Sequence, residues 1–138
     1  MIIGLTGRNC AGKGTVAEYF TGQSFGYYSL SDAIRQHLKE QGIPESRDNL
    51  IAAGNQLRRE GGPGVLGAKI LALLEPGKDY VVDSIRNPAE VVELRTRPDF
   101  VLLEVRAPER VRYERLVARG RIGDATSFEE FQRQEQAE

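Results

Sequence analysis

The feature that most constrains this chain is a glycine-rich turn near its amino end. Ile2–Thr6 is a short apolar run, residues 7–15 follow as Gly-Arg-Asn-Cys-Ala-Gly-Lys-Gly-Thr, and residues 15–20 have helix-forming character. This order predicts a strand, a tight loop and a helix. The rest of the fold has to be built around that unit.

The remaining chain continues the alternation of strands and helices. Further β-rich runs lie at residues 25–30, 80–83 and 100–105. Between and after them, segments of helical period lie at about residues 32–41, 47–59, 65–74, 88–95 and 109–118, with good N-cap residues at Ser31–Asp32 and capping-box spacing from Ser127 to Glu130. Such alternation is typical of a parallel sheet covered by helices. The sequence therefore predicts the α/β class.

The glycine-rich turn has the spacing of a phosphate-binding loop. Gly7 and Gly12 lie five positions apart and Lys13 follows directly, after a strand and before a helix. In that context backbone N–H groups and the helix N-terminus can surround a phosphate, and a lysine can reach the β- and γ-phosphates. We expect the loop to bind ATP through Gly7, Asn9, Ala11, Gly12, Lys13, Gly14 and Thr15.

The metal-binding position of this loop departs from the usual pattern. Ser or Thr normally follows the lysine and binds Mg²⁺ through its hydroxyl group, whereas here Gly14 follows it and Thr15 comes next. Asp83 closes a buried strand, so its carboxylate is expected beside the loop. We expect Mg²⁺ near Thr15 and Asp83, and the sequence leaves open whether it is held directly or through water.

Composition excludes several classes of protein. The 138 residues carry a formal net charge of −1. This charge argues against a uniformly basic nucleic-acid binder and against a polybasic membrane-surface protein. No apolar run approaches the ~18 residues that span a bilayer, and no signal-peptide pattern is present. The single cysteine excludes an intramolecular disulfide and a cysteine metal cluster. We expect one cytoplasmic domain over residues 1–138 with no nucleic-acid or membrane partner.

The motifs beyond the loop resemble those of the nucleoside monophosphate kinases. Gly-Lys-Gly-Thr in the loop, Ser31-Asp32-Ala-Ile-Arg35 after the second strand and Asp83-Ser-Ile-Arg86 after the third occur in that family's order. The resemblance implies that Asp32 and Arg35 hold the acceptor phosphate, and that Asp83 and Arg86 act beside the transferred phosphoryl group.

Two further segments resemble mobile parts of those kinases. Arg119-Gly-Arg121-Ile-Gly-Asp124 is similar to a shortened lid, which we place at residues 119–126. Residues 31–75 are expected to form a helical acceptor-binding insertion, in which Arg58 offers phosphate contacts and Gly62 and Gly64 belong to a glycine hinge.

The overall spacing is similar to the small adenylate-kinase-related proteins of archaea and bacteria. The shared segment is Gly54-Asn-Gln-Leu-Arg-Arg followed by Gly62-Pro-Gly-Val-Leu. This resemblance implies a three-layer P-loop NTPase fold with sheet order 2-3-1-4. The family's fifth strand has no counterpart before Glu138, so we expect a truncated version with an exposed fourth-strand edge, which a homodimer would cover.

The predicted reaction is ATP-dependent phosphoryl transfer to a nucleoside or deoxynucleoside monophosphate. Lys13, Arg86, Arg119 and Arg121 are expected to stabilise the transition state and Asp83 to organise the metal. Two alternatives stay open. The opening Ile3-Gly-Leu-Thr-Gly7 resembles dephospho-CoA kinase, and a non-catalytic nucleotide-sensing P-loop module would share the loop.

Overall fold

A computed structural model describes residues 1–137 of the chain. Its sheet has four strands, β1 (Ile2–Thr6), β2 (Gly26–Ser29), β3 (Tyr80–Ile85) and β4 (Phe100–Glu104). All three neighbouring pairs are parallel, and the strand order is β2-β3-β1-β4. The predicted α/β class and the order 2-3-1-4 are therefore confirmed.

Seven helices connect and cover these strands within residues 1–137. They are α1 (Lys13–Gly22), α2 (Leu30–Glu40), α3 (Arg47–Gly61), α4 (Val65–Leu71), α5 (Pro88–Leu94), α6 (Glu109–Arg119) and α7 (Phe128–Ala137). Helix α1 packs on one face of the sheet, with Ala17 against Ile3, Leu5 and Val81. The opposite face carries the larger core, to which α2, α4 and α5 contribute buried apolar side chains.

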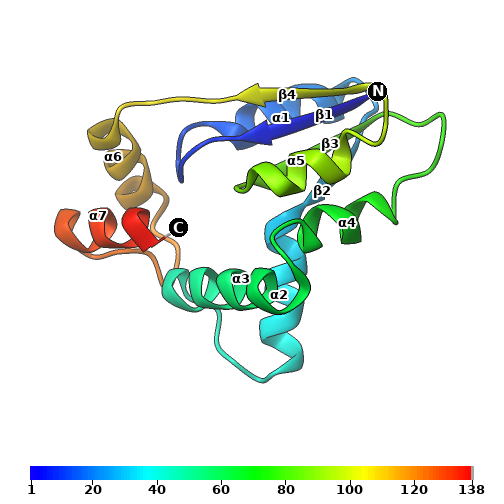
Figure 1. Ribbon diagram of the computed structural model, residues 1–138. Coiled ribbons are helices and arrows are strands. Elements are labelled where there is room, and N and C mark those ends of the chain that lie inside the picture. Colours follow the sequence, from blue (N-terminus) through cyan, green and yellow to red (C-terminus); the bar gives the residue numbers. More distant parts are fainter. Residues whose placement is uncertain (138) are drawn as a thin grey trace.

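A third apolar cluster lies away from both faces of the sheet. Leu116 of α6, Ala125 and Phe131 of α7 are buried together, with Tyr113 and Phe128 packed against them. Figure 1 shows α6 and α7 beyond the carboxyl ends of β1 and β4, with α2 and α3 below them. The carboxyl edge of the sheet is thus enclosed by helices, which is where open parallel sheets bind their ligands.

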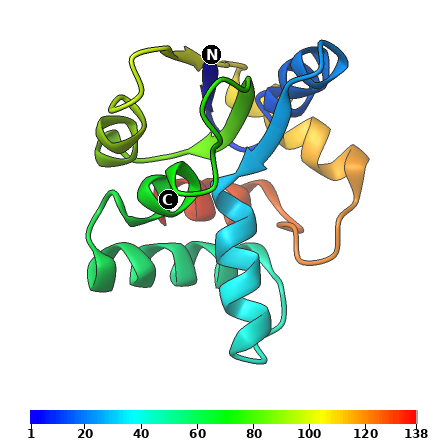
Figure 2. The ribbon, with the colours of Figure 1, turned by 90° about the vertical axis from the view of Figure 1, so that its right-hand side faces the viewer.

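Three local details differ from the sequence expectations. Helix α2 follows β2 directly, as Figure 2 shows for the blue strand and the cyan helix. Ser29 rather than Ser31–Asp32 therefore occupies the N-cap and accepts a hydrogen bond from Ser31 N. At the start of α7, Ser127 accepts from Glu130 N as expected, but the Glu130 carboxylate accepts from the backbone N–H of Thr126. Strand β3 continues to Ile85 through Ser84, whose φ of 64° accompanies an irregular register with β1.

Both β2 and β4 are edges of the sheet in residues 1–137, which contain no fifth strand. None of the helices described is both long enough and apolar enough to cross a membrane.

Candidate functional site

The glycine-rich loop folds tightly between β1 and α1. Gly7 has a φ of 148°, and a side chain there would collide with the carbonyl oxygen of Val105. Gly12, with a φ of 111°, occupies the N-cap of α1 and supplies no capping side chain. The first N–H groups of α1 are therefore left without a side-chain cap, and these groups are the ones that bind anions at a helix N-terminus.

Lys13 lies inside this loop and is only 8% exposed. Its Nζ donates hydrogen bonds to the carbonyl oxygens of Gly7 (2.9 Å) and Arg8 (3.1 Å), and Arg86 also donates to Gly7 O. Burial, as the largest cause, and the nearby Arg86 charge together lower the pKa of Lys13 to about 8, although the Asp83 charge opposes this. The ammonium group is thus held where an additional negative charge would stabilise it.

The end of β3 places a second chemical group beside the loop. Asp83 is 6% exposed, and its carboxylate accepts hydrogen bonds from Tyr27 Oη (2.9 Å) and Ser84 N (2.6 Å). Burial and then the Asp83 charge raise the pKa of Tyr27 to about 12, so its hydroxyl remains a donor. The sequence motifs did not indicate Tyr27 as a partner of Asp83, because Tyr27 belongs to β2, which pairs with β3 only in the folded sheet.

The residues near Asp83 fit a weakly held magnesium ion. The Asp83 carboxylate and the Thr15 hydroxyl both border the cleft and are hard oxygen donors of the kind that Mg²⁺ prefers. Residues 1–137 contain no cluster of three His, Cys, Asp or Glu side chains able to form a complete metal cage. Phosphate oxygens and water would therefore have to supply most of the ligands, as is usual for Mg²⁺.

A cleft of about 500 Å³ opens over the loop. Its other walls come from β2 and α2, the start of α3, the end of β3, and α6 with the segment that follows it. Its lining includes many of the residues expected from the sequence: Asn9, Gly12, Lys13, Gly14, Thr15, Arg35, Asp83, Arg86, Arg119 and Arg121. Seven cations face it in all, against the three carboxylates of Glu45, Asp83 and Asp124. The cleft is therefore strongly cationic although the whole chain is nearly neutral.

Two predicted loop residues and four predicted acceptor residues do not line this cleft. Gly7 and the buried Ala11 shape the loop from behind. Asp32 borders a separate hollow between α2 and the segment after it, and pairs with Arg35 at 3.1 Å. Gly62 ends α3, and Gly64 lies at the start of α4 against the Ala89 carbonyl of α5.

Arg58 does not line this cleft but borders a smaller cavity of about 60 Å³, which shares Arg47, Ser84 and Arg86 with the cleft. Its Nε donates to Glu90 Oε1 at 2.8 Å, and Glu90 is fully buried. The other oxygen of Glu90 accepts from the backbone N–H groups of Arg86 and Asn87. Arg58 therefore balances a buried carboxylate that organises the start of α5.

The arginines of the expected lid differ in their surroundings. Arg119 forms a two-bonded ion pair with Asp124, at 2.9 and 2.8 Å. Arg121 is exposed at the rim of the cleft, next to Ile122, which is 99% exposed. Arg35, which lines the cleft from α2, pairs with Glu45 at 2.8 Å.

The structure adds two cleft arginines that the motifs did not indicate. Arg47, the first residue of α3, has its pKa lowered to about 10 by burial and by the charges of Arg86 and Arg119. Arg115 of α6 donates to the carbonyl oxygens of Cys10 and Ala11. Both belong to helices correctly expected from the sequence, but only the tertiary arrangement brings them to the loop.

Cys10 of the loop has a free, half-buried thiol. Burial is the largest influence and raises the pKa of its thiol above the ordinary value. Thiolate is the reactive form of cysteine, so this environment disfavours it.

Comparisons with known proteins assign the family. The family profile described as an AAA domain matches residues 3–137. A UPF0200 protein of Pyrococcus abyssi is 37% identical over 138 residues, covering 95% of this chain and 74% of its own. A UPF0200 protein of Pyrococcus horikoshii is 34% identical with the same coverage. The chain belongs to the AAA domain family and to the UPF0200 proteins.

Solved structures place this UPF0200 chain among P-loop kinase-like folds. A putative kinase from Chloroflexus aurantiacus superposes with a TM-score of 0.63 and 19% identity, covering 97% of this chain and 77% of that one. A gluconokinase from Sinorhizobium meliloti superposes with a TM-score of 0.58 and 19% identity, covering 98% of this chain and 73% of that one. At this identity the likeness concerns the fold. It supports the expected P-loop fold, while the nucleoside monophosphate kinase family remains a prediction.

Proposed function

We propose that this UPF0200 protein transfers the γ-phosphoryl group of ATP to a nucleoside or deoxynucleoside monophosphate. The observation that carries the proposal is one cleft that joins the phosphate loop around Lys13 to arginines from α2, α3, the residue after β3, α6 and the α6–α7 connection. A loop alone could serve any nucleotide-binding protein. A loop facing further cations across one cleft favours a reaction between two phosphate-bearing molecules.

The donor side of the cleft is the phosphate loop and the start of α1. The loop N–H groups and Lys13 would bind the ATP phosphates, with Asn9, Gly12, Gly14 and Thr15 around them. Asp83 and Thr15 would hold Mg²⁺ directly or through water, and the ion would supply charge neutralisation on the phosphates. Tyr27 holds the Asp83 carboxylate in position by donating a 2.9 Å hydrogen bond to it.

The acceptor side is formed by α2 and α3, within the proposed acceptor-binding segment 31–75. Arg35 and Arg47 line the cleft from these helices, and Arg86 lines it as well while donating to the Gly7 carbonyl of the loop. Guanidinium groups bind phosphate through two parallel hydrogen bonds, so this side suits a phosphate-bearing acceptor better than a neutral sugar. The pairing of Arg35 with Glu45 would have to loosen when the acceptor enters.

The chemistry requires charge compensation more than a dedicated base. Phosphoryl transfer has a loose transition state whose charge lies on the transferred oxygens. Lys13 and Arg86 both contact the Gly7 carbonyl and are placed beside the donor phosphates. Arg119 and Arg121 would approach from the proposed lid, residues 119–126, after the Asp124 pairing of Arg119 has rearranged.

The test is an ATP-dependent screen of all nucleoside and deoxynucleoside monophosphates, with dephospho-CoA and gluconate as further acceptors. We expect product with at least one monophosphate, and loss of at least ~100-fold in kcat/KM for Lys13→Ala, because a transition-state charge partner is removed. Lys39→Ala, an exposed lysine at the end of α2, is the matched control and should retain activity.

The other outcomes separate the alternatives. Product with dephospho-CoA alone would assign the chain to that reaction, and product with gluconate alone would assign a sugar-acid kinase. ATP binding by calorimetry without product on any acceptor would favour a nucleotide-sensing module. A wild-type protein that binds no ATP would overturn the proposal entirely.

A further inference from the structure

The phosphate loop rests on a platform made by the last two helices. Leu116 of α6 and Phe131 of α7 form the centre of a buried cluster, against which Cys10 of the loop packs. This cluster is separate from the two cores that flank the sheet. The helices α6 and α7 therefore contact the loop from the side opposite to its connection with the sheet.

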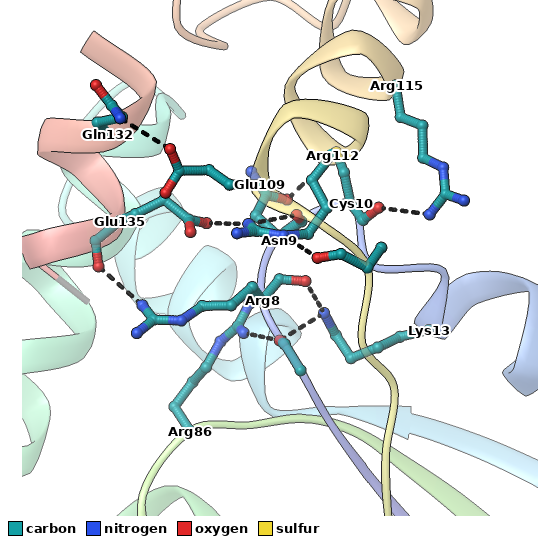
Figure 3. A network of polar contacts seen from close by, with 12 residues as sticks. Arg8, Asn9, Cys10, Lys13, Arg86, Glu109, Arg112, Arg115, Gln132 and Glu135 are labelled. Atoms are coloured by element: carbon teal, nitrogen blue, oxygen red, sulfur yellow. Dashed lines mark hydrogen bonds and ion pairs between the residues drawn. The ribbon is translucent and has the colours of Figure 1, made fainter. Parts of the chain in front are cut away.

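Arg112 is the centre of the polar contacts on this platform (Figure 3). It is 6% exposed, and its guanidinium donates to Glu135 Oε1 (2.7 Å), Ala107 O (3.0 Å) and Asn9 O (3.4 Å). Its charge also lies 5.7 Å from the centre of the Phe131 ring. These four contacts together fix the orientation of the Arg112 side chain.

Glu135 completes the connection between α7 and the loop. Its carboxylate is buried with Arg112, and its backbone carbonyl accepts a hydrogen bond from the Arg8 side chain at 3.0 Å. Arg115, one turn further along α6, donates to Cys10 O (3.1 Å) and Ala11 O (3.2 Å). Three consecutive loop carbonyls, those of Asn9, Cys10 and Ala11, are thus held by arginines of α6.

Holding a carbonyl oxygen also fixes the following N–H group. A trans peptide is planar, so its C=O and N–H bonds point in opposite directions. Because the Asn9 and Ala11 carbonyls are bound toward α6, the N–H groups of Cys10 and Gly12 are directed away from α6. The peptide between Cys10 and Ala11 is fixed at both ends, since Ala11 N donates to Arg8 O at 3.1 Å.

We infer that Arg112, locked by Glu135, is a positioning residue that aims the phosphate-loop N–H groups at the bound ATP phosphates. The inference rests on the proposed ATP binding at this loop. It makes α7, the most distant helix in the sequence, part of the nucleotide site without touching the nucleotide. Preorganised N–H donors bind an anion more tightly because no reorganisation is needed on binding.

The burial of the ion pair supports this assignment over a purely structural one. A buried salt bridge can often be replaced by apolar side chains of similar volume with little change in stability. Arg112 and Glu135 are 6% and 8% exposed, and Arg112 lies over the Phe131 ring of the buried cluster, where an apolar side chain would also pack. Apolar residues cannot supply the hydrogen bonds that Arg112 donates to Ala107 O, before α6, and to Asn9 O, and only the second of these reaches the phosphate loop.

The double substitution Arg112→Met with Glu135→Leu tests the inference. It removes both buried charges together, so thermal stability should stay close to that of the wild type. We expect ATP binding by calorimetry to weaken about tenfold, as for one lost hydrogen bond. In steady-state kinetics the KM for ATP should rise while the KM for the acceptor is unchanged, a split that general loosening of the fold would not give.

Two further variants keep the test decisive. Arg112→Lys retains the charge but lacks the guanidinium fork, so it should weaken ATP binding even if the double variant does not fold. Arg133→Ala, on α7 as Glu135 is, removes an exposed ion pair with Asp48 and should bind ATP within twofold of the wild type. A folded double variant or an Arg112→Lys protein with wild-type ATP affinity would overturn the inference. Absence of ATP binding in the wild type would instead overturn the proposed function.

Discussion

Lys13 illustrates how a single residue is prepared for a ligand. Its ammonium group is buried, and its hydrogen bonds go to the carbonyl oxygens of Gly7 and Arg8. Burial therefore dominates and lowers the pKa of Lys13 to about 8. A bound polyphosphate would add negative charge beside the ammonium and favour the protonated form, so the pKa of Lys13 should rise on binding.

This shift predicts proton uptake when ATP binds. At pH 8.5, above the pKa of about 8, most of the free protein has a neutral Lys13, so binding should take up more than half a proton. At pH 6.5 Lys13 is already charged and contributes no uptake. Calorimetry in two buffers of different ionisation enthalpy measures the difference.

Lys13→Arg is the matched control for that measurement. An arginine in this position stays protonated across the range, so the pH-dependent uptake should disappear while some ATP binding remains. Equal proton uptake in the variant and the wild type at pH 8.5 would show that another group titrates.

At the scale of elements, two short helices depend on glycine for their contact. Gly64 and Gly67 of the α4 region face α5, and a Cβ on Gly67 would lie 2.8 Å from the carbonyl oxygen of Glu90. The sequence analysis assigned the glycine cluster to an acceptor hinge. Around Gly64 and Gly67 the structure shows close helix packing, which in turn holds Glu90 and the start of α5 beside Arg86.

This packing predicts opposite effects for two glycine-to-alanine substitutions. Gly67→Ala should lower the free energy of unfolding by about 1–3 kcal/mol, because α4 must move away from α5. Gly22→Ala, in the last turn of α1 with no atom within 4 Å of the new Cβ, should leave stability unchanged or raise it by up to ~1 kcal/mol. Urea denaturation of both variants measures the two values. A neutral Gly67→Ala would show that α4 is not tightly held against α5.

At the scale of the whole molecule, the fold concentrates positive charge. The chain as a whole has a net charge of −1, yet seven cationic side chains and three carboxylates line one cleft. The cations come from residues as far apart as Lys13 and Arg121. Lys13, Arg47 and Arg86 each have a pKa lowered first by burial, with other cations of the chain adding to the effect. Their mutual repulsion opposes folding until an anion binds.

A divalent anion should therefore stabilise the unliganded protein. At matched ionic strength, 10 mM sulfate is expected to raise Tm by about 3 °C or more relative to chloride, because it binds the folded state. Arg47→Ala should reduce this gain, since Arg47 faces the cleft from α3. Differential scanning calorimetry measures the rise in Tm that sulfate causes. Arg59→Ala, which removes an exposed arginine of the same helix, is the control. An identical sulfate effect in Arg47→Ala would assign the gain to general salt exclusion.

The elements were largely predictable from local sequence, and their exceptions have physical reasons. Apolar periodicity and turn residues located all four strands and seven helices to within a few residues. The cap of α2 was misplaced because Ser29, Ser31 and Asp32 are all good capping residues, and the choice depends on where β2 stops pairing with β3. The ion pair of Arg58 with Glu90 was not predicted, because no local pattern reveals a buried partner 32 residues away.

The sequence by itself determined the phosphate loop, the α/β class and the parallel sheet, because these depend on glycine spacing, charge position and periodicity over a few residues. Only the tertiary structure decided which of the fifteen arginines face the cleft and which balance buried carboxylates. It placed Arg47 in the cleft, turned Arg58 toward Glu90 and set Arg112 behind the loop. The physical reason is that a long charged side chain takes its role from the partners it meets across the fold, and those partners lie far away in sequence.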